Sequence, residues 1–94
     1  MLDDTIGRKD DGVKLRWTLL PIKAVEDVVD VLEYGAAKYA VDNWRHLDDA
    51  RNRYLNAAIR HIAQVMKGEN YDKESHKHHL AHAVCSLLFI LEKE

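Results

Sequence analysis

The segment from Ser75 to Leu91 constrains the fold most, because it is apolar on two opposite sides. At about 100° per residue, one side of a helix formed here carries Leu80, Ala81, Val84, Leu87, Leu88 and Leu91. The other side carries His79, His82, Ser86, Phe89 and Ile90. A helix that is apolar all round is buried all round, and two further helices from the same chain can hardly cover it. We therefore expect a partner subunit, with the histidine pair lying in an interior cleft.

Two more helices are predicted upstream. Pro21 suits the first turn of a helix, and apolar residues then recur at helical spacing at Ile22, Val25, Val28, Val29, Leu32, Ala36 and Tyr39. The second helix has the apolar face Tyr54, Leu55, Ala58, Ile62, Val65 and Met66. Asp48 or Asp49 can cap its start, and Gly68 is expected to end it. Ser75 is the expected N-cap of the third helix.

No alternation of apolar and polar residues persists long enough to predict a strand. The predicted fold class is therefore all-α, a three-helix unit that completes a helical bundle through homo-oligomerisation. The length of 94 residues indicates one domain. We expect a flexible N-terminal arm over residues 1–16 and a single all-α domain over residues 17–94, because the first segment is polar and lacks periodicity.

Composition excludes several classes of protein. A net charge of −2 leaves no basic excess to neutralise a phosphate backbone, so no nucleic-acid polymer is expected as a partner. The single cysteine, Cys85, cannot form an internal disulfide, which suits a reducing compartment. No apolar run approaches the ~20 residues of a membrane span, and the N-terminal residues do not begin a signal peptide. We expect a cytoplasmic protein without a membrane segment.

Most groups that could bind a metal or move a proton lie between Gly68 and His82, where three carboxylates precede four histidines. Divalent cations use carboxylate oxygens and neutral imidazole nitrogens as ligands. Residues three apart on a helix share a face, and a helix N-terminus disfavours imidazolium, so His79 and His82 can reach one ion in their neutral form. Adding the nearest inward histidine gives the predicted metal site, formed by His61, Glu69, Asp72, His79 and His82. The same residues are also compatible with an ordinary polar layer between helices.

Two further groups are candidates for binding a substrate. Lys14 and Arg16 could reach over a site and hold phosphate oxygens, or they could be solvated residues beside an anchoring tryptophan. In the predicted loop that follows the first helix, Asn43 and Trp44 could read a base through amide hydrogen bonds and stacking. Trp44 could equally plug the end of the bundle.

Several segments, in order, resemble the phage family known as the dATP/dGTP diphosphohydrolase N-terminal domain. The matching segments span roughly residues 12–92 and are GVKLRWTLLP from Gly12, YGAAKY from Tyr34, Asn43-Trp44, Arg60-His61, GENYD from Gly68, Glu74-Ser75 and HLAHA from His79. The family is similar in outline to the all-α, MazG-like nucleotide pyrophosphohydrolases, which hold Mg²⁺ or Mn²⁺ with helix-borne carboxylates. Where those enzymes carry paired carboxylates, this chain carries His79 and His82.

The resemblance implies metal-dependent hydrolysis of a purine deoxynucleoside triphosphate, dATP or dGTP, to the monophosphate and pyrophosphate. The metal ion would be Mg²⁺ or Mn²⁺, with Zn²⁺ or another transition metal as the alternative. Glu69 is the expected acceptor of the water proton, so Glu69→Gln should abolish turnover. Lys14, Arg16, Lys38 and Arg60 are then candidates to bind the triphosphate, because arginine and lysine side chains donate to phosphate oxygens. A homodimer or homotetramer in the host cytoplasm completes this interpretation.

Two other functions fit the same residues. One is a non-catalytic helical module that binds a nucleotide or a partner protein, with the histidines as a structural metal site or polar layer. The other is a metal-dependent phosphohydrolase of a different substrate, such as a nucleoside monophosphate.

Overall fold

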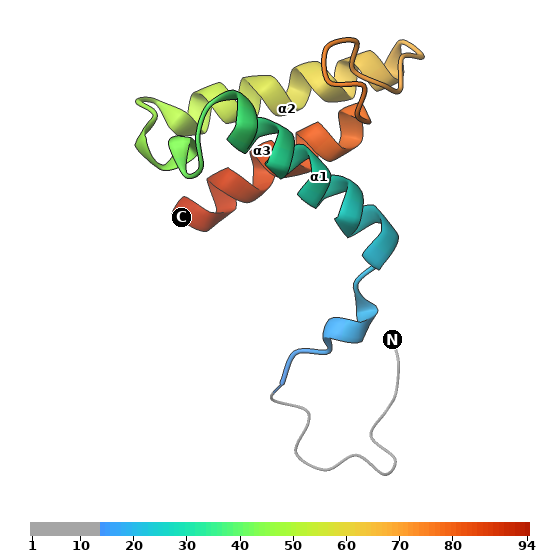
Figure 1. Ribbon diagram of the computed structural model, residues 1–94, viewed down its shortest axis with the longest axis vertical. Coiled ribbons are helices and arrows are strands. Elements are labelled where there is room, and N and C mark those ends of the chain that lie inside the picture. The colour runs from blue at the N-terminus through green and yellow to red at the C-terminus, as the bar shows by residue number, and fades with distance from the viewer. Residues whose placement is uncertain (1–13) are drawn as a thin grey trace.

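A computed structural model describes residues 14–94, and these residues form three α-helices (Figure 1). The helices are α1 (Ile22–Lys38), α2 (Ala50–Met66) and α3 (His79–Lys93). Two short 3-10 turns, η2 (Trp17–Leu19) and η3 (Asn43–His46), precede α1 and α2. Over the described range there is no strand, only one isolated bridge between Tyr71 and His78. The all-α prediction is confirmed.

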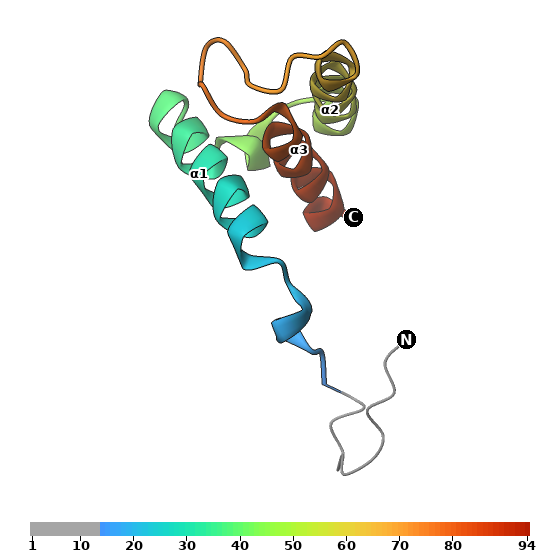
Figure 2. The same cartoon turned by 90° about the vertical axis from the view of Figure 1, so that its right-hand side faces the viewer.

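Helix α3 is the central element and lies between α1 and α2 (Figure 2). Its small residues Ala81 and Cys85 are buried with Val31 of α1, and Val28, Leu32 and Phe89 pack against this cluster. Small side chains on α3 let α1 approach its backbone closely, because the distance between helix axes depends on the side chains at the contact. Ala83 of α3 and Ala58 of α2 are buried as well, so the core consists mainly of small side chains.

The ends of α1 and α2 lie where the sequence predicts them. Helix α1 finishes at Lys38 with Tyr39 as its C-cap, and Gly68, with a φ of 96°, follows the C-cap of α2. Asp49 occupies the N-cap position of α2, but its backbone is left-handed and its side chain makes no capping hydrogen bond. The predicted N-cap position of α2 is therefore correct, but Asp49 does not make the side-chain hydrogen bond expected of a cap.

The start of α3 differs from the prediction, because Ser75 is not its N-cap. The Ser75 N–H donates instead to the Asp72 carboxylate at 2.9 Å, and His76 takes a left-handed φ of 63°. An aspartate that accepts the N–H three residues on stabilises a turn that competes with helix. The N-cap is His78, three residues after the predicted cap, and its side chain accepts the Leu80 N–H at 3.0 Å, so α3 begins at His79.

One side of α3 remains exposed in the single chain. We call it the leucine face, and it consists of Leu80, Val84, Leu87, Leu88 and Leu91, whose exposed fractions run from 40% to 70%. Its cover by a partner subunit remains a prediction. Met66, which we placed on the apolar face of α2, is 83% exposed in the single chain. Met66 is the last residue of α2.

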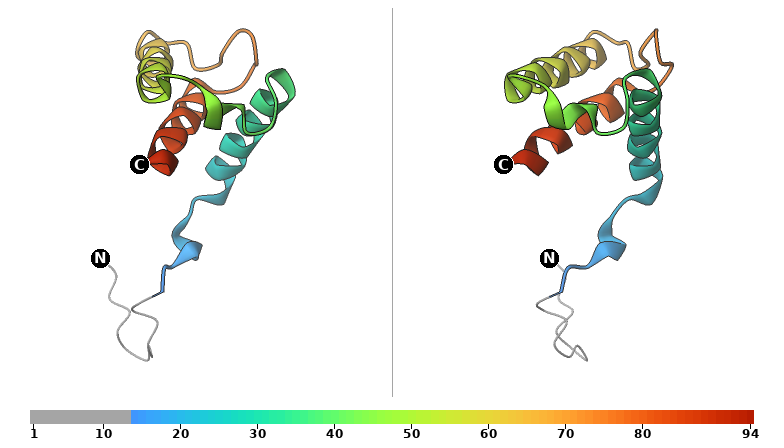
Figure 3. Two further views of the ribbon diagram at one scale, coloured as in Figure 1. Left: turned by 90° about the vertical axis from the view of Figure 1, so that its left-hand side faces the viewer. Right: turned by 60° about the vertical axis from the view of Figure 1, so that its left-hand side comes forward.

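The segment from residue 14 to residue 20 leads away from the three helices (Figures 1 and 3). Its apolar side chains are largely exposed, with Leu15 at 78% and Trp17 at 70%. The predicted flexible arm over residues 1–16 lies mostly outside the described residues.

Candidate active site

The end of α2 positions Glu69. The Gly68 N–H donates to the Val65 carbonyl and the Glu69 N–H donates to the Gln64 carbonyl, each at 2.9 Å. These two bonds form a Schellman motif, which needs a left-handed residue at the position of Gly68. The motif turns the chain back sharply, so Glu69 faces the start of α3.

Residues 70–78 form a closed loop that returns the chain to this point. The Asp72 N–H donates to the Lys77 carbonyl and the His79 N–H to the Asn70 carbonyl, both at 2.8 Å. The Lys77 side chain also pairs with Asp30 of α1 at 2.8 Å. The loop is therefore tied to itself and to α1, and it fixes the position of His79.

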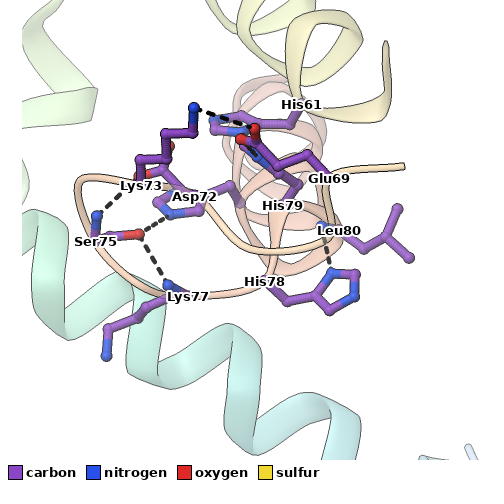
Figure 4. Close-up of polar contacts among 10 residues, drawn as sticks. His61, Glu69, Asp72, Lys73, Ser75, Lys77, His78, His79 and Leu80 are labelled. Atoms are coloured by element: carbon purple, nitrogen blue, oxygen red, sulfur yellow. Dashed lines mark hydrogen bonds and ion pairs between the residues drawn. The ribbon is translucent and has the colours of Figure 1, made fainter. Parts of the chain in front are cut away.

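A row of hydrogen bonds connects Glu69 to α2 through His79 (Figure 4). The Glu69 carboxylate lies 2.9 Å from His79 Nε2, and His79 Nδ1 lies 2.8 Å from His61 Nδ1. His79 is only 3% exposed. Both nitrogens of this buried imidazole therefore have protein partners.

His82 lies one turn further along α3, and the loop holds it from the other side. Its Nε2 lies 2.7 Å from Ser75 Oγ, and the Lys77 N–H donates to the same oxygen at 3.2 Å. The His82 ring stacks on the His61 ring, with centroids 4.6 Å apart and an angle of 10° between the planes. Sequence reasoning assigned Ser75 no role in the site, although its spacing from Asp72 is the signal of a local turn.

Burial keeps the histidines facing the cavity uncharged. It lowers the pKa of His61 to about 4, and the neighbouring His82 and His79 lower it further in the same direction. Burial also lowers the pKa of His82. Burial alone would raise the pKa of the Asp72 carboxyl, but the hydrogen bonds from Ser75 outweigh this effect and the pKa is lowered. At neutral pH this part of the site combines neutral imidazoles with an ionised carboxylate.

A second polar cluster lies across the site, on α1. The Glu74 carboxylate accepts the Tyr34 hydroxyl at 2.8 Å and pairs with the Lys38 ammonium. The hydrogen bond that Lys38 donates to Glu74 raises the pKa of Lys38, and the hydrogen bonds that Glu74 accepts from Lys38 and Tyr34 lower the pKa of Glu74. Both groups are charged at neutral pH, so Lys38 presents a fixed cation at this edge.

These groups surround a cavity of about 650 Å³ between α1, α2, α3 and the loop at residues 40–44. This volume lies within the usual range of about 300–1,000 Å³ for small-molecule sites. Its polar lining includes Glu33, Lys38, Asp42, Asn43, His61, Asp72, Glu74 and His82. Its apolar lining includes Val31, Leu32, Ala36, Tyr39, Tyr54 and Phe89.

The predicted site residues separate into three groups. His61, Asp72, His82, Lys38, Asn43 and Trp44 line the cavity. Glu69 and His79 do not line it and lie behind His61. Lys14, Arg16 and Arg60 are exposed and are not among the lining residues.

Trp44 has two neighbours that bear on its predicted role. Phe89 stacks on its ring at 4.7 Å with an angle of 13°, and the Arg45 guanidinium lies 4.3 Å from the ring centroid. The indole therefore packs against the end of α3, which corresponds to the plugging role left open by the sequence.

The residues present do not form a metal cage of histidines. Within residues 14–94, no three His, Cys, Asp or Glu side chains are arranged to hold one ion. Protein partners engage both nitrogens of His79. Mg²⁺, however, is commonly bound by one or two carboxylates together with substrate phosphates, and the cavity lining contains carboxylates that suit this second mode.

The fold and this cavity define a class of protein, a small all-helical domain with a nucleotide-sized site walled by neutral histidines and carboxylates. The chain belongs to the family described as dATP/dGTP diphosphohydrolase, N-terminal, whose sequence model matches residues 4–94. It is 37% identical over 84 residues to a protein of Salmonella phage PMBT28 named dATP/dGTP diphosphohydrolase.

That alignment covers 89% of this chain but only 28% of the phage protein, so the chain spans less than a third of its relative. No solved structure matches the chain significantly. No helix in the described part of the chain is long and apolar enough to cross a membrane.

Proposed function

We propose that this domain hydrolyses purine deoxynucleoside triphosphates, dATP or dGTP, to the monophosphate and pyrophosphate, in a reaction that depends on a divalent metal ion. Membership of the family and the name of the phage relative support a phosphohydrolase acting on these nucleotides. The observation that carries the proposal is the cavity of about 650 Å³, whose lining brings apolar side chains and titratable groups together.

The charge of the cavity supports the dependence on a metal. Its lining contains four carboxylates, those of Glu33, Asp42, Asp72 and Glu74, and one ammonium, that of Lys38. A triphosphate would be repelled by this excess of negative charge unless cations accompany it. A divalent ion bound with the nucleotide would neutralise phosphate charge and lower the pKa of an attacking water.

The cavity lining contains groups that suit both ends of a nucleotide. Leu32 and Tyr54 are apolar lining residues that could contact the base, and Asn43 has an amide that can donate and accept hydrogen bonds. Lys38 is the lining cation and binds a phosphate oxygen. Lys14, Arg16 and Arg60 lie outside the cavity of a single chain. Their role in binding the triphosphate therefore stays a prediction.

Asp72 is the group we propose to accept the proton of the attacking water. Its carboxylate lines the cavity and is ionised, because its pKa is lowered. One of its oxygens accepts the Ser75 N–H at 2.9 Å, and the Ser75 hydroxyl also stabilises the ionised carboxylate. Glu69, our sequence-based candidate for this role, lies behind His61 and acts on the site through His79.

The test is to incubate the purified protein with each of the four dNTPs, with and without Mg²⁺ or Mn²⁺, and to separate the products by chromatography. Metal-dependent formation of dAMP or dGMP with pyrophosphate is expected. Release of orthophosphate and a diphosphate would contradict attack at the α-phosphorus. A folded, metal-supplied protein that binds dATP without turning it over would instead support the non-catalytic binding module.

A further inference from the structure

Figure 4 shows the row formed by Glu69, His79 and His61, and His61 lines the cavity. Glu69 begins it at the end of α2, His79 is the first residue of α3, and His61 lies in the last two turns of α2. Only His61 of the three reaches the cavity. Glu69 and His79 can therefore affect the cavity through His61, by influencing which ring nitrogen of His61 carries the proton.

The hydrogen bonds restrict these positions. An ionised carboxylate can only accept, so His79 must place a proton on Nε2 to bond Glu69 at 2.9 Å. A neutral imidazole carries one proton, which leaves a lone pair on His79 Nδ1. His61 must then donate from Nδ1 across the 2.8 Å contact. Neutral His61 consequently keeps the lone pair on Nε2, which has no protein partner in the described chain.

We propose that Glu69 and His79 are positioning residues that fix His61 in the Nδ1–H tautomer, so that Nε2 is the electron-pair donor His61 offers to the cavity. The atom would take a hydrogen-bond donor, such as a water or a sugar hydroxyl, or a divalent metal ion. Histidines that bind metals commonly have their other nitrogen oriented by a carboxylate in this way. The inference deepens the proposed function but does not require catalysis.

The charge of His79 decides whether the chain of bonds runs in this direction. A doubly protonated His79 would donate to His61 and force the opposite tautomer, with the proton on Nε2. The tautomer of His61 therefore reports on the whole arrangement.

The tautomer can be measured directly on the free protein by NMR of ¹⁵N-labelled histidine rings at pH 7.5, with the His61 signals assigned from their loss in His61→Gln. We expect a protonated Nδ1 and a bare Nε2 on His61. A protonated Nε2 on His61 would overturn the proposal. The measurement requires no substitution of Glu69.

Variants separate positioning from a merely structural role. Glu69→Leu removes the acceptor, so His61 should populate both tautomers, whereas Glu69→Gln keeps an acceptor oxygen and should retain the Nδ1–H form. Lys73→Gln is the matched control, because Lys73 is 3.9 Å from the other Glu69 oxygen and does not touch the histidines. An unchanged tautomer in folded Glu69→Leu would contradict the proposal.

Additions of Mn²⁺ and of dATP distinguish the two ligand types proposed for His61 Nε2, a divalent metal ion and a hydrogen-bond donor. Selective broadening of the His61 ring signals by Mn²⁺ would show that Nε2 binds a metal ion. A His61 signal that stays sharp with Mn²⁺ but shifts when dATP is added would show that Nε2 accepts a hydrogen bond instead. Equal broadening of all six histidines, or no response of His61 to either addition, would contradict an available lone pair at this wall. These readouts are independent of turnover, so they can fail while the hydrolase proposal stands, and the reverse.

Discussion

His61 and Cys85 both line the cavity, and burial moves each toward its uncharged form. The pKa of His61 is lowered to about 4, and the pKa of the Cys85 thiol is raised to about 11. Neither group is charged at neutral pH, so the charges in the cavity come from carboxylates and from Lys38. This balance is the residue-scale reason for expecting a cation with any phosphorylated ligand.

Asp72→Asn tests the proposed acceptor of the water proton. The amide oxygen of asparagine can still accept the Ser75 N–H, so the loop should stay folded. Turnover of dATP should fall by about 10²-fold or more, the usual contribution of a positioned acid or base. Asp48→Asn is the matched control, since Asp48 is exposed and does not line the cavity. Full activity in folded Asp72→Asn would remove Asp72 from this role.

Glu69→Gln distinguishes the two assignments of the proton acceptor. If Glu69 took the proton from water, the substitution would abolish turnover. Because the glutamine oxygen can still accept from His79, our account expects most of the turnover to remain. Steady-state rates under saturating dATP and metal measure the difference, and loss of turnover in a protein with a wild-type melting temperature would favour Glu69 itself.

The lowered pKa of His61 also predicts how stability depends on pH. Below a pH of about 6.5 an unfolded histidine binds a proton, while folded His61 resists it until the pH approaches 4. The unfolded state therefore binds more protons in this window, and stability is lost as the pH falls through it. The melting temperature should drop between pH 6.5 and 4, and the drop should be smaller in His61→Gln. An equal drop in both proteins would contradict the assignment.

At the scale of the element, the turn after α2 depends on one backbone conformation. Gly68 has a φ of 96°, and no atom lies within 4 Å of the position a Cβ would take, so a side chain there is disfavoured by the backbone alone. Gly68→Ala should destabilise the fold by about 1–2 kcal/mol. Gly35, inside α1, also has open space around it, so Gly35→Ala should stabilise by about 0.5–1 kcal/mol. Urea unfolding of the pair measures both, and equal effects would contradict this assignment.

The sequence predicts an element well when the residues that determine it lie within one short segment. The bounds of α1 and the stop at Gly68 follow from periodicity and from glycine, both visible in one segment. The start of α3 was misplaced because Asp72 competes for the Ser75 N–H. The sequence brings Glu69, His79 and His61 into one list of candidates but cannot show their order in a row, since that order depends on where the loop at residues 70–78 returns.

At the scale of the molecule, the main feature is unburied apolar surface. The leucine face is exposed on α3, and no large side chain in the described chain is fully buried. Contiguous apolar patches of this kind commonly mark interaction sites, and the homodimer or homotetramer expected from the sequence stays a prediction. The helix with apolar residues on two sides thus has one side buried within the chain and one side available for a partner.

Leu87→Glu should dissociate the predicted homo-oligomer, because a charge placed in the leucine face disfavours its burial. Sedimentation at several concentrations measures the change, and Met66→Glu on α2 is the control for an exposed apolar residue elsewhere. A wild-type protein that is monomeric at all concentrations would contradict the predicted assembly.

The measurement that tests the central claim most directly is hydrolysis of dATP in ¹⁸O-labelled water with Mn²⁺, followed by mass analysis of both products. Our account predicts that the label enters dAMP, because water attacks the α-phosphorus and pyrophosphate leaves with its original oxygens. Label in the pyrophosphate, or in released orthophosphate, would contradict it.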